Sequence, residues 1–178
     1  MLVKLAQFLT IMLYVLVAGV MWGTWLSLGR TMTAYDASIF LADGKHMIAN
    51  LATVMAVLMI SAGVVGLLAT VLLFRAGPTT AGWLALFGLF MMVAVIAVTL
   101  SVEVPIDNEI KTWTVATLPS DWQDIRARWA GFHTLRTFLS LAAVAVAVGA
   151  ALAFPRTPQT NTTPVETAQR DADSHLRQ

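Results

Sequence analysis

Long uninterrupted apolar runs, separated by short polar segments, dominate the chain. The four runs are residues 5–28, 47–74, 83–104 and 132–154. Each is at least as long as the roughly 20 residues that a helix needs to cross about 30 Å of hydrocarbon. The runs are continuous, whereas the strands of a membrane barrel alternate between apolar and polar residues. We therefore predict an all-α fold, a four-helix transmembrane bundle, within residues 1–154.

The composition agrees with this pattern. Of 178 residues, 58% are hydrophobic and 12% are charged, and the mean hydropathy is +0.75. A net charge of +1 argues against a nucleic-acid partner, and the lack of cysteine excludes disulfides and cysteine-ligated metals. The sequence also lacks the nucleotide-binding, serine-hydrolase and zinc-protease motifs of soluble enzymes.

The first apolar run follows Lys4, and a secretory signal also has a positive charge before its apolar region. It is longer than a signal's apolar region of about 7–15 residues and has no clear cleavage site, so we predict a retained helix. We expect a multi-pass protein of the bacterial inner membrane, with the lipid bilayer as a partner. Both termini are expected in the cytoplasm, and residues 155–178 are expected to form a disordered polar tail.

Small residues recur at a spacing of four near the end of the first run, at Gly19, Gly23 and Ser27. Such a ladder lets a neighbouring helix approach closely. We expect it to pack inside the bundle, and a homo-oligomer contact is the alternative.

Aromatic, cationic and imidazole side chains gather in residues 119–137, between the third and fourth runs. Five of them share one helical face, at spacings of four, three, four and three: Trp122, Arg126, Trp129, His133 and Arg136. We predict an interfacial helix here, with guanidinium groups toward water, which either runs into the fourth span or breaks at Gly131.

Chain topology brings further polar residues to the same side of the membrane. In a bundle of antiparallel spans, the first and third spans end where the second and fourth begin. His46, Glu103 and Asn108 therefore approach the membrane face that carries the tryptophan and arginine segment. Asn50, one turn after His46, lies inside the second apolar run, where an interhelical hydrogen bond is favoured over a ligand role.

Two motifs carry a family resemblance. They read V-E-V-P-I-D-N-E-I at residues 102–110 and D-W-x-x-I-R-A-R-W-x-x-x-H-T-L-R-T at residues 121–137. With the four-run layout, they resemble the anthrone oxygenase-like membrane proteins, a family also classed as a domain of unknown function. In that family a V-P-x-N-N-like turn follows helix three, and R-W-x-x-x-(H or N)-x-x-R-T opens helix four. Here Asp107 stands where many members have the first Asn, and Asn108 keeps the second.

The resemblance implies an activity. Some fungal relatives oxidise an anthrone to an anthraquinone with molecular oxygen and without a recognised cofactor. The implied reaction is oxidation of a hydrophobic phenolic, anthrone or quinol-like compound, with oxygen as co-substrate and no cofactor predicted. Such chemistry needs a base, a cation near the enolate oxygen and a flat apolar pocket.

The candidate residues can be assigned to these roles. We expect His133 to be the base, oriented by Glu103, and Arg136 to stabilise the enolate oxygen. The candidates for substrate binding are Trp122, Arg126, Trp129, Asn108, His46 and Asn50.

Three other interpretations stay open. Glu103 can form a structural ion pair with His133 or Arg136 in the first turn of the fourth span. His46, Glu103 and His133 can hold a non-haem iron, and a haem is not excluded, although no local ligand spacing supports either. The third is a non-enzymatic ligand-binding or structural membrane protein. A carrier is disfavoured, because a carrier would show internal repeats and midplane polar residues.

Overall fold

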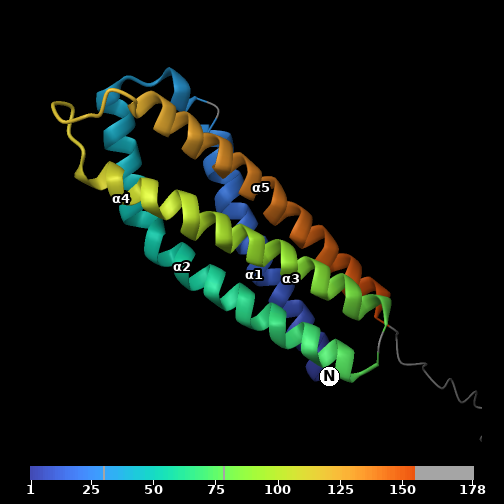
Figure 1. The fold of residues 1–178 in the computed structure, drawn as a ribbon. Coiled ribbons are helices and arrows are strands. Elements are labelled where there is room, and N and C mark those ends of the chain that lie inside the picture. The colour runs from blue at the N-terminus through green and yellow to red at the C-terminus, as the bar shows by residue number, and fades with distance from the viewer. Residues whose placement is uncertain (30, 78, 155–178) are drawn as a thin grey trace, which may run out of the picture.

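The computed structural model describes residues 1–29, 31–77 and 79–154, and every regular element in these ranges is a helix (Figure 1). In chain order they are α1 (Leu2–Thr24), η1 (Trp25–Gly29), η2 (Met32–Ala34), α2 (Ala37–Arg75), α3 (Thr80–Val98), η3 (Thr99–Glu103), α4 (Val104–Thr112) and α5 (Trp122–Ala153). The short elements η1 and η3 are π-helical, and η2 is a 3-10 turn. The predicted tail, residues 155–178, lies outside the described residues.

Four helical stretches of the described chain are long and apolar enough to cross a membrane. They are Leu2–Ala34, Ala37–Arg75, Thr80–Thr112 and Trp122–Ala153. Each contains nearly all of one predicted apolar run. The predicted all-α, four-helix transmembrane bundle is confirmed.

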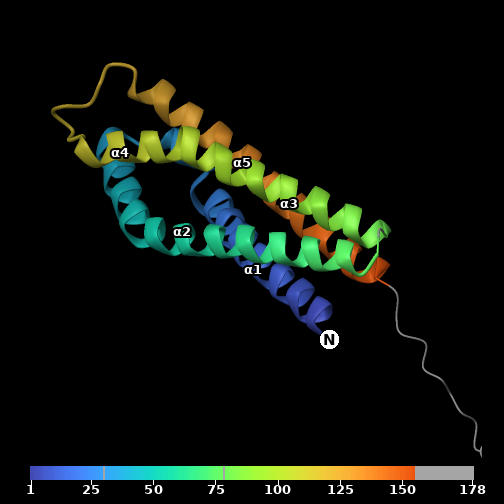
Figure 2. The same cartoon turned by 60° about the horizontal axis from the view of Figure 1, so that its bottom comes forward.

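The four long helices form a ring of antiparallel neighbours. α1 packs against α2 and α5, and α3 packs against the same two helices from the other side. The N-terminus, the turn between α2 and α3, and the end of α5 lie at one end of the bundle, while η2, α4 and the start of α5 lie at the other (Figures 1 and 2). The second end is therefore where the predicted polar residues gather.

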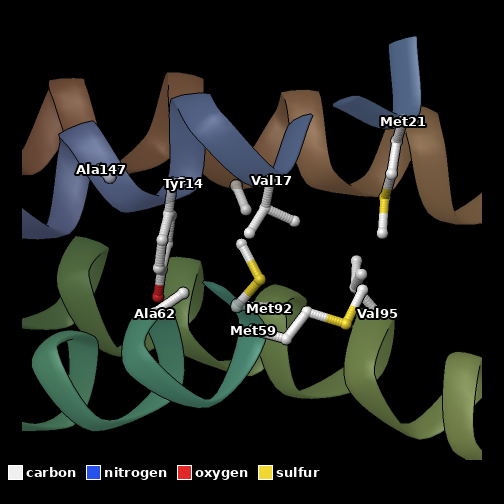
Figure 3. Packing of buried hydrophobic residues seen from close by; sticks show 9 residues of the cluster. Tyr14, Val17, Met21, Met59, Ala62, Met92, Val95 and Ala147 are labelled. Atoms are coloured by element: carbon white, nitrogen blue, oxygen red, sulfur yellow. The ribbon is translucent and has the colours of Figure 1, made fainter. Parts of the chain in front are cut away.

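Two apolar clusters fill the bundle. The central cluster draws on all four long helices and comprises Tyr14, Val17, Met21, Met59, Ala62, Met92, Val95, Ala143 and Ala147 (Figure 3). The second cluster lies at the α4 end and comprises Met32, Phe40, Leu41, Ile48, Ile106, Ile110, Trp113 and Trp129. The candidate site lies between them.

α2 begins at Ala37, well before the apolar run that predicted it. Asp36 caps this start, because its carboxylate accepts the Ile39 N–H at 2.9 Å and the Ser38 hydroxyl at 2.8 Å. These hydrogen bonds favour the charged carboxylate and hold the pKa of Asp36 below its usual value. The cap, and not the end of the apolar run, decides where this helix starts.

A separate interfacial helix between the third and fourth spans is not seen in the described residues. Of the two expected alternatives, the helix runs straight into the fourth span: α5 is unbroken from Trp122 through Gly131 to Ala153. His133, expected in the first turn of the fourth span, is thus the twelfth residue of α5, about 16 Å from its start at 1.5 Å per residue. The site therefore lies deeper in the bundle than the apolar run alone indicated.

The segment after the third span, expected as a turn, is also helical. α4 continues α3 through the π-helical η3. Pro105 sits in the first turn of α4, where it has no N–H to donate and its ring crowds the preceding turn. A wider π turn just before the proline gives the ring room, so the helix continues.

The small-residue ladder of α1 does not pack inside the bundle, so that expectation is wrong. Gly19 and Gly23 are exposed, and a Cβ atom added at either would meet nothing within 4 Å. The close approach to α1 occurs at Gly66 of α2, where an added Cβ would lie 2.6 Å from the Tyr14 hydroxyl oxygen. The buried stripe of α1 follows Tyr14, a different face from the ladder.

We expect Gly66→Ala to destabilise the protein by about 1–3 kcal/mol, as is typical of overpacking. Tyr14 is 1% exposed and packs in the central cluster, so its ring must shift among buried neighbours to make room for the added methyl group. Thermal unfolding in detergent measures the effect. Gly19→Ala is the matched control, and an equal effect of the two substitutions would contradict the packing described here.

Candidate functional site

A cavity of about 270 Å³ lies between the two apolar clusters. Met21 and Met59 of the central cluster and Ile48 and Trp129 of the second cluster form part of its wall. Its volume is close to the lower end of the roughly 300–1,000 Å³ typical of ligand pockets. All four membrane-spanning stretches contribute side chains to the wall.

Most of this wall is apolar, and its polar side chains lie mainly on the third and fourth spans. The polar and indole side chains are Thr24, Thr99, Asp107, Trp129, His133 and Arg136. An apolar chamber with a few convergent polar groups is the usual form of a small-molecule site.

The cavity reaches the apolar flank of the bundle between α2 and the third span. Five of its lining residues are exposed: Ala52, Ala56, Ile60 at 66%, Leu100 at 63% and Val104 at 38%. α2 is bent along its length, as Figure 2 shows. This exposed flank is apolar, as expected of a surface that contacts lipid.

The polar wall is built by two antiparallel helices. Thr99, Glu103 and Asp107 recur every four residues along η3 and α4 and so follow one face. Opposite them, the Trp129 indole donates to Asp107 Oδ1 at 3.1 Å. Arg136, two turns further along α5, pairs with Glu103 Oε2 at 3.0 Å and donates to Thr99 Oγ1 at 3.2 Å. Each of the three residues on η3 and α4 thereby contacts a side chain of α5.

The ion pair of Glu103 and Arg136 is buried. Their side chains are 1% and 12% exposed. Both charges are removed from water, and each is compensated mainly by the other. The contact expected from the structural interpretation is therefore present, and it fixes η3 against α5.

His133 is bound to the same arginine. Arg136 Nη2 lies 3.0 Å from His133 Nδ1, and a guanidinium can only donate, so Nδ1 accepts and the imidazole is neutral with its proton on Nε2. The ring is 2% exposed and stacks on Trp129 with the two planes 4° apart. Nε2 makes no hydrogen bond to a described residue, although the backbone of Met21 is close to the ring. This geometry favours a hydrogen-bond donor over the base expected from the sequence.

Glu103 does not orient His133 directly. Among the described residues its ion pair is with Arg136, which also holds His133. The arginine thus links the carboxylate to the imidazole.

Asp107 is a cavity residue that the sequence analysis did not predict, since the sequence marks it only as a departure from the family motif. It lines the cavity and is half-buried. Its spacing of four from Glu103 was the available signal, since that spacing places both carboxylates on one helical face.

Trp122 and Arg126 lie outside the cavity. Arg126 is 6% exposed, so the expectation that its guanidinium faces water is wrong. It donates to the carbonyl oxygens of Tyr35 at 2.9 Å and Thr33 at 3.0 Å, and it lies over the Trp122 ring at 4.7 Å. The arginine therefore holds the η2 turn against α5.

His46, Asn50 and Asn108 are exposed and do not line the cavity. Asn108 accepts a hydrogen bond from Lys111 at 3.0 Å, and the described residues show no interhelical hydrogen bond of Asn50. The described part of the chain also holds no group of three His, Cys, Asp or Glu side chains that could bind a metal ion. The grouping of His46 with Glu103 and His133 is thus not formed.

A family model described as anthrone oxygenase matches residues 44–146, more than half of the chain. The chain belongs to the anthrone oxygenase family. The match runs from α2 through most of α5 and includes the polar lining residues of the third and fourth spans. α1 lies outside it, although Val20, Met21 and Thr24 line the cavity. No curated protein and no solved structure matches the chain. The predicted resemblance to this family is confirmed.

We expect Glu103→Ala to destabilise the protein by about 3–5 kcal/mol, because the buried Arg136 would lose the carboxylate with which it pairs directly. Chemical unfolding in detergent gives the free energy. Glu109→Ala, an exposed site on the same helix, serves as the control. A Glu103→Ala protein as stable as this control would show that the pair is not structural.

Arg126→Met should destabilise the protein by about 1.5–3 kcal/mol, because two hydrogen bonds to a charged donor are lost while the apolar stem is kept. Arg128→Met, which changes an exposed arginine of the same helix, should have little effect. Unfolding of both variants in detergent tests the difference. Equal stabilities would refute a structural role for Arg126.

Proposed function

We propose that this protein uses molecular oxygen to oxidise a flat, hydrophobic phenolic compound of the anthrone class, without a cofactor. One observation carries the proposal: an apolar cavity that reaches the exposed flank of the bundle is lined by His133 and Arg136, whose Nε2 and Nε atoms are buried without a hydrogen-bond partner in the described structure. Family membership supports the type of reaction. Quinol-like compounds belong to the same chemical class.

The net reaction needs no additional reductant. An anthrone-type CH₂ group becomes a carbonyl group and gives up four electrons. Oxygen accepts all four, because one of its atoms becomes the carbonyl oxygen and the other leaves as water. The protein has only to bind the substrate, move protons and stabilise charge.

The lateral opening suits a substrate dissolved in the membrane. A polycyclic phenol partitions into hydrocarbon, and the exposed rim residues Ile60 and Leu100 lie where lipid chains would contact the bundle. Inside, methionines such as Met55 and Met59 offer an adaptable apolar wall for rings of different shape.

The donors of the polar wall suit the charge that develops during the reaction. Loss of the acidic C–H proton places negative charge on the ring carbonyl oxygen. His133 Nε2 and Arg136 Nε are both buried and lack a hydrogen-bond partner in the described structure. A preorganised donor of this kind is worth about 2.7–4 kcal/mol to an oxyanionic transition state. His133 acts here as an electrophile, and Glu103 keeps the arginine in place.

A second candidate is a ligand-binding membrane protein without turnover. The buried pair of Glu103 and Arg136 favours it, because such a pair also serves to join two helices. Both candidates bind a flat aromatic compound in the cavity, and they differ in oxygen uptake.

Purified protein in lipid nanodiscs should oxidise anthrone to anthraquinone with matching oxygen uptake, faster than empty nanodiscs. His133→Gln keeps an N–H donor near the Nε2 position and should retain most of the rate. His133→Leu should lose about 10²–10³-fold, the usual effect of removing an oxyanion donor. Glu109→Gln, exposed on α4, is the control.

The outcomes separate the candidates. Binding of anthraquinone without oxygen uptake would favour the non-enzymatic protein. A rate no higher than that of empty nanodiscs would refute oxidation of this substrate class. A His133→Leu protein as active as wild type would remove the histidine from the mechanism.

A further inference from the structure

We propose that Asp107 is the catalytic proton acceptor, the group that removes the acidic C–H proton of the substrate. The inference rests on the proposed function and deepens it by naming the base. Proton removal is the step that makes the substrate reactive toward oxygen.

The placement of Asp107 suits this role. Its side chain lines the cavity, and its Oδ1 atom accepts the Trp129 indole N–H at 3.1 Å. The indole holds the carboxyl group in one orientation. No described residue donates a hydrogen bond to the other oxygen, Oδ2, so its lone pairs remain available to a bound molecule.

The other candidate bases are either engaged or outside the cavity wall. Arg136 occupies His133 Nδ1, and the second ring nitrogen carries the proton. Glu103 is ion-paired, is 1% exposed and is not among the residues that line the cavity. Among the described lining residues, Asp107 alone has a carboxyl group.

The charges around the cavity favour proton uptake. Asp107 and Glu103 lie one turn apart and face a single buried cation, Arg136, while His133 is neutral. Lys111 of α4 is exposed, and its ammonium donates to Asn108. The buried wall thus carries one negative charge in excess, which a proton on Asp107 would neutralise.

The step can be written atom by atom. The C–H bond breaks, the proton moves to Asp107, and the electron pair enters the ring system, with the charge on the oxygen beside His133. Oxygen forms a bond to the carbanion carbon and takes up two electrons. The resulting peroxide receives the proton from Asp107. Loss of the remaining C–H proton and cleavage of the O–O bond then release water and leave the carbonyl group.

Hydrogen–deuterium exchange without oxygen isolates the first half of this sequence. Wild-type protein in nanodiscs is incubated with anthrone in D₂O under argon, and deuterium at the CH₂ carbon is measured by mass spectrometry. The wild type should accelerate exchange over empty nanodiscs. Asp107→Asn keeps the acceptor for Trp129 but cannot take a proton, so the accelerated rate should fall by about 10²–10⁴-fold.

Three controls keep the test interpretable. Thermal unfolding and anthraquinone binding should be close to wild type in Asp107→Asn, since its shape is kept. Asp107→Glu retains a carboxyl group and should restore part of the exchange. Glu109→Gln, on the exposed face of α4, should exchange like wild type.

The results distinguish this inference from the proposed function. An Asp107→Asn protein that exchanges or oxidises at the wild-type rate overturns the role of Asp107 while oxidation stands. The wild type can also accelerate exchange, and Asp107→Asn can lose that acceleration, while neither protein consumes oxygen. This result supports Asp107 as the proton acceptor and refutes the proposed oxidation. A wild type that exchanges no faster than empty nanodiscs overturns the inference, and so does an exchange loss in Asp107→Glu as large as in Asp107→Asn.

Discussion

The buried contact of Arg136 with Glu103 is the interaction on which the site depends. One guanidinium binds the carboxylate, the Thr99 hydroxyl and His133 Nδ1. It thereby joins the third span to the fourth and sets the histidine tautomer. Because both charges are far from water, neither residue can leave the pair without a large free-energy penalty. The same contact that stabilises the bundle therefore places the proton of His133 on Nε2.

The π turn before Pro105 is the second constraint. It lets one helix pass a proline without ending, so that Thr99, Glu103 and Asp107 continue along one face toward α5. α2 is bent in the same part of the bundle (Figure 2). The cavity lies between the two apolar clusters and is lined by residues of both.

Sequence reasoning recovered the part of the site that lies on single helices. Trp129, His133 and Arg136 share a face by spacing alone, and Glu103 was identified as the partner from chain topology. The spacing of residues, however, shows which side chains share a helical face and does not show which other helix that face contacts. Arg126 belongs to the same stripe as Arg136, yet it binds the η2 turn because it lies nearly three turns closer to the start of α5. His46, Asn50 and Asn108 reach the expected end of the bundle but point outward.

The sequence by itself determined the four membrane-spanning helices, their antiparallel order and the family. These follow from the length of apolar runs and from local motifs, which need no knowledge of neighbouring helices. Only the tertiary structure decided how deep the site lies, which side of α1 is buried, and that Asp107 joins the cavity. Those features depend on how each helix is rotated against its neighbours, which is settled by contacts between residues distant in the chain, such as Arg136 with Glu103 and Trp129 with Asp107.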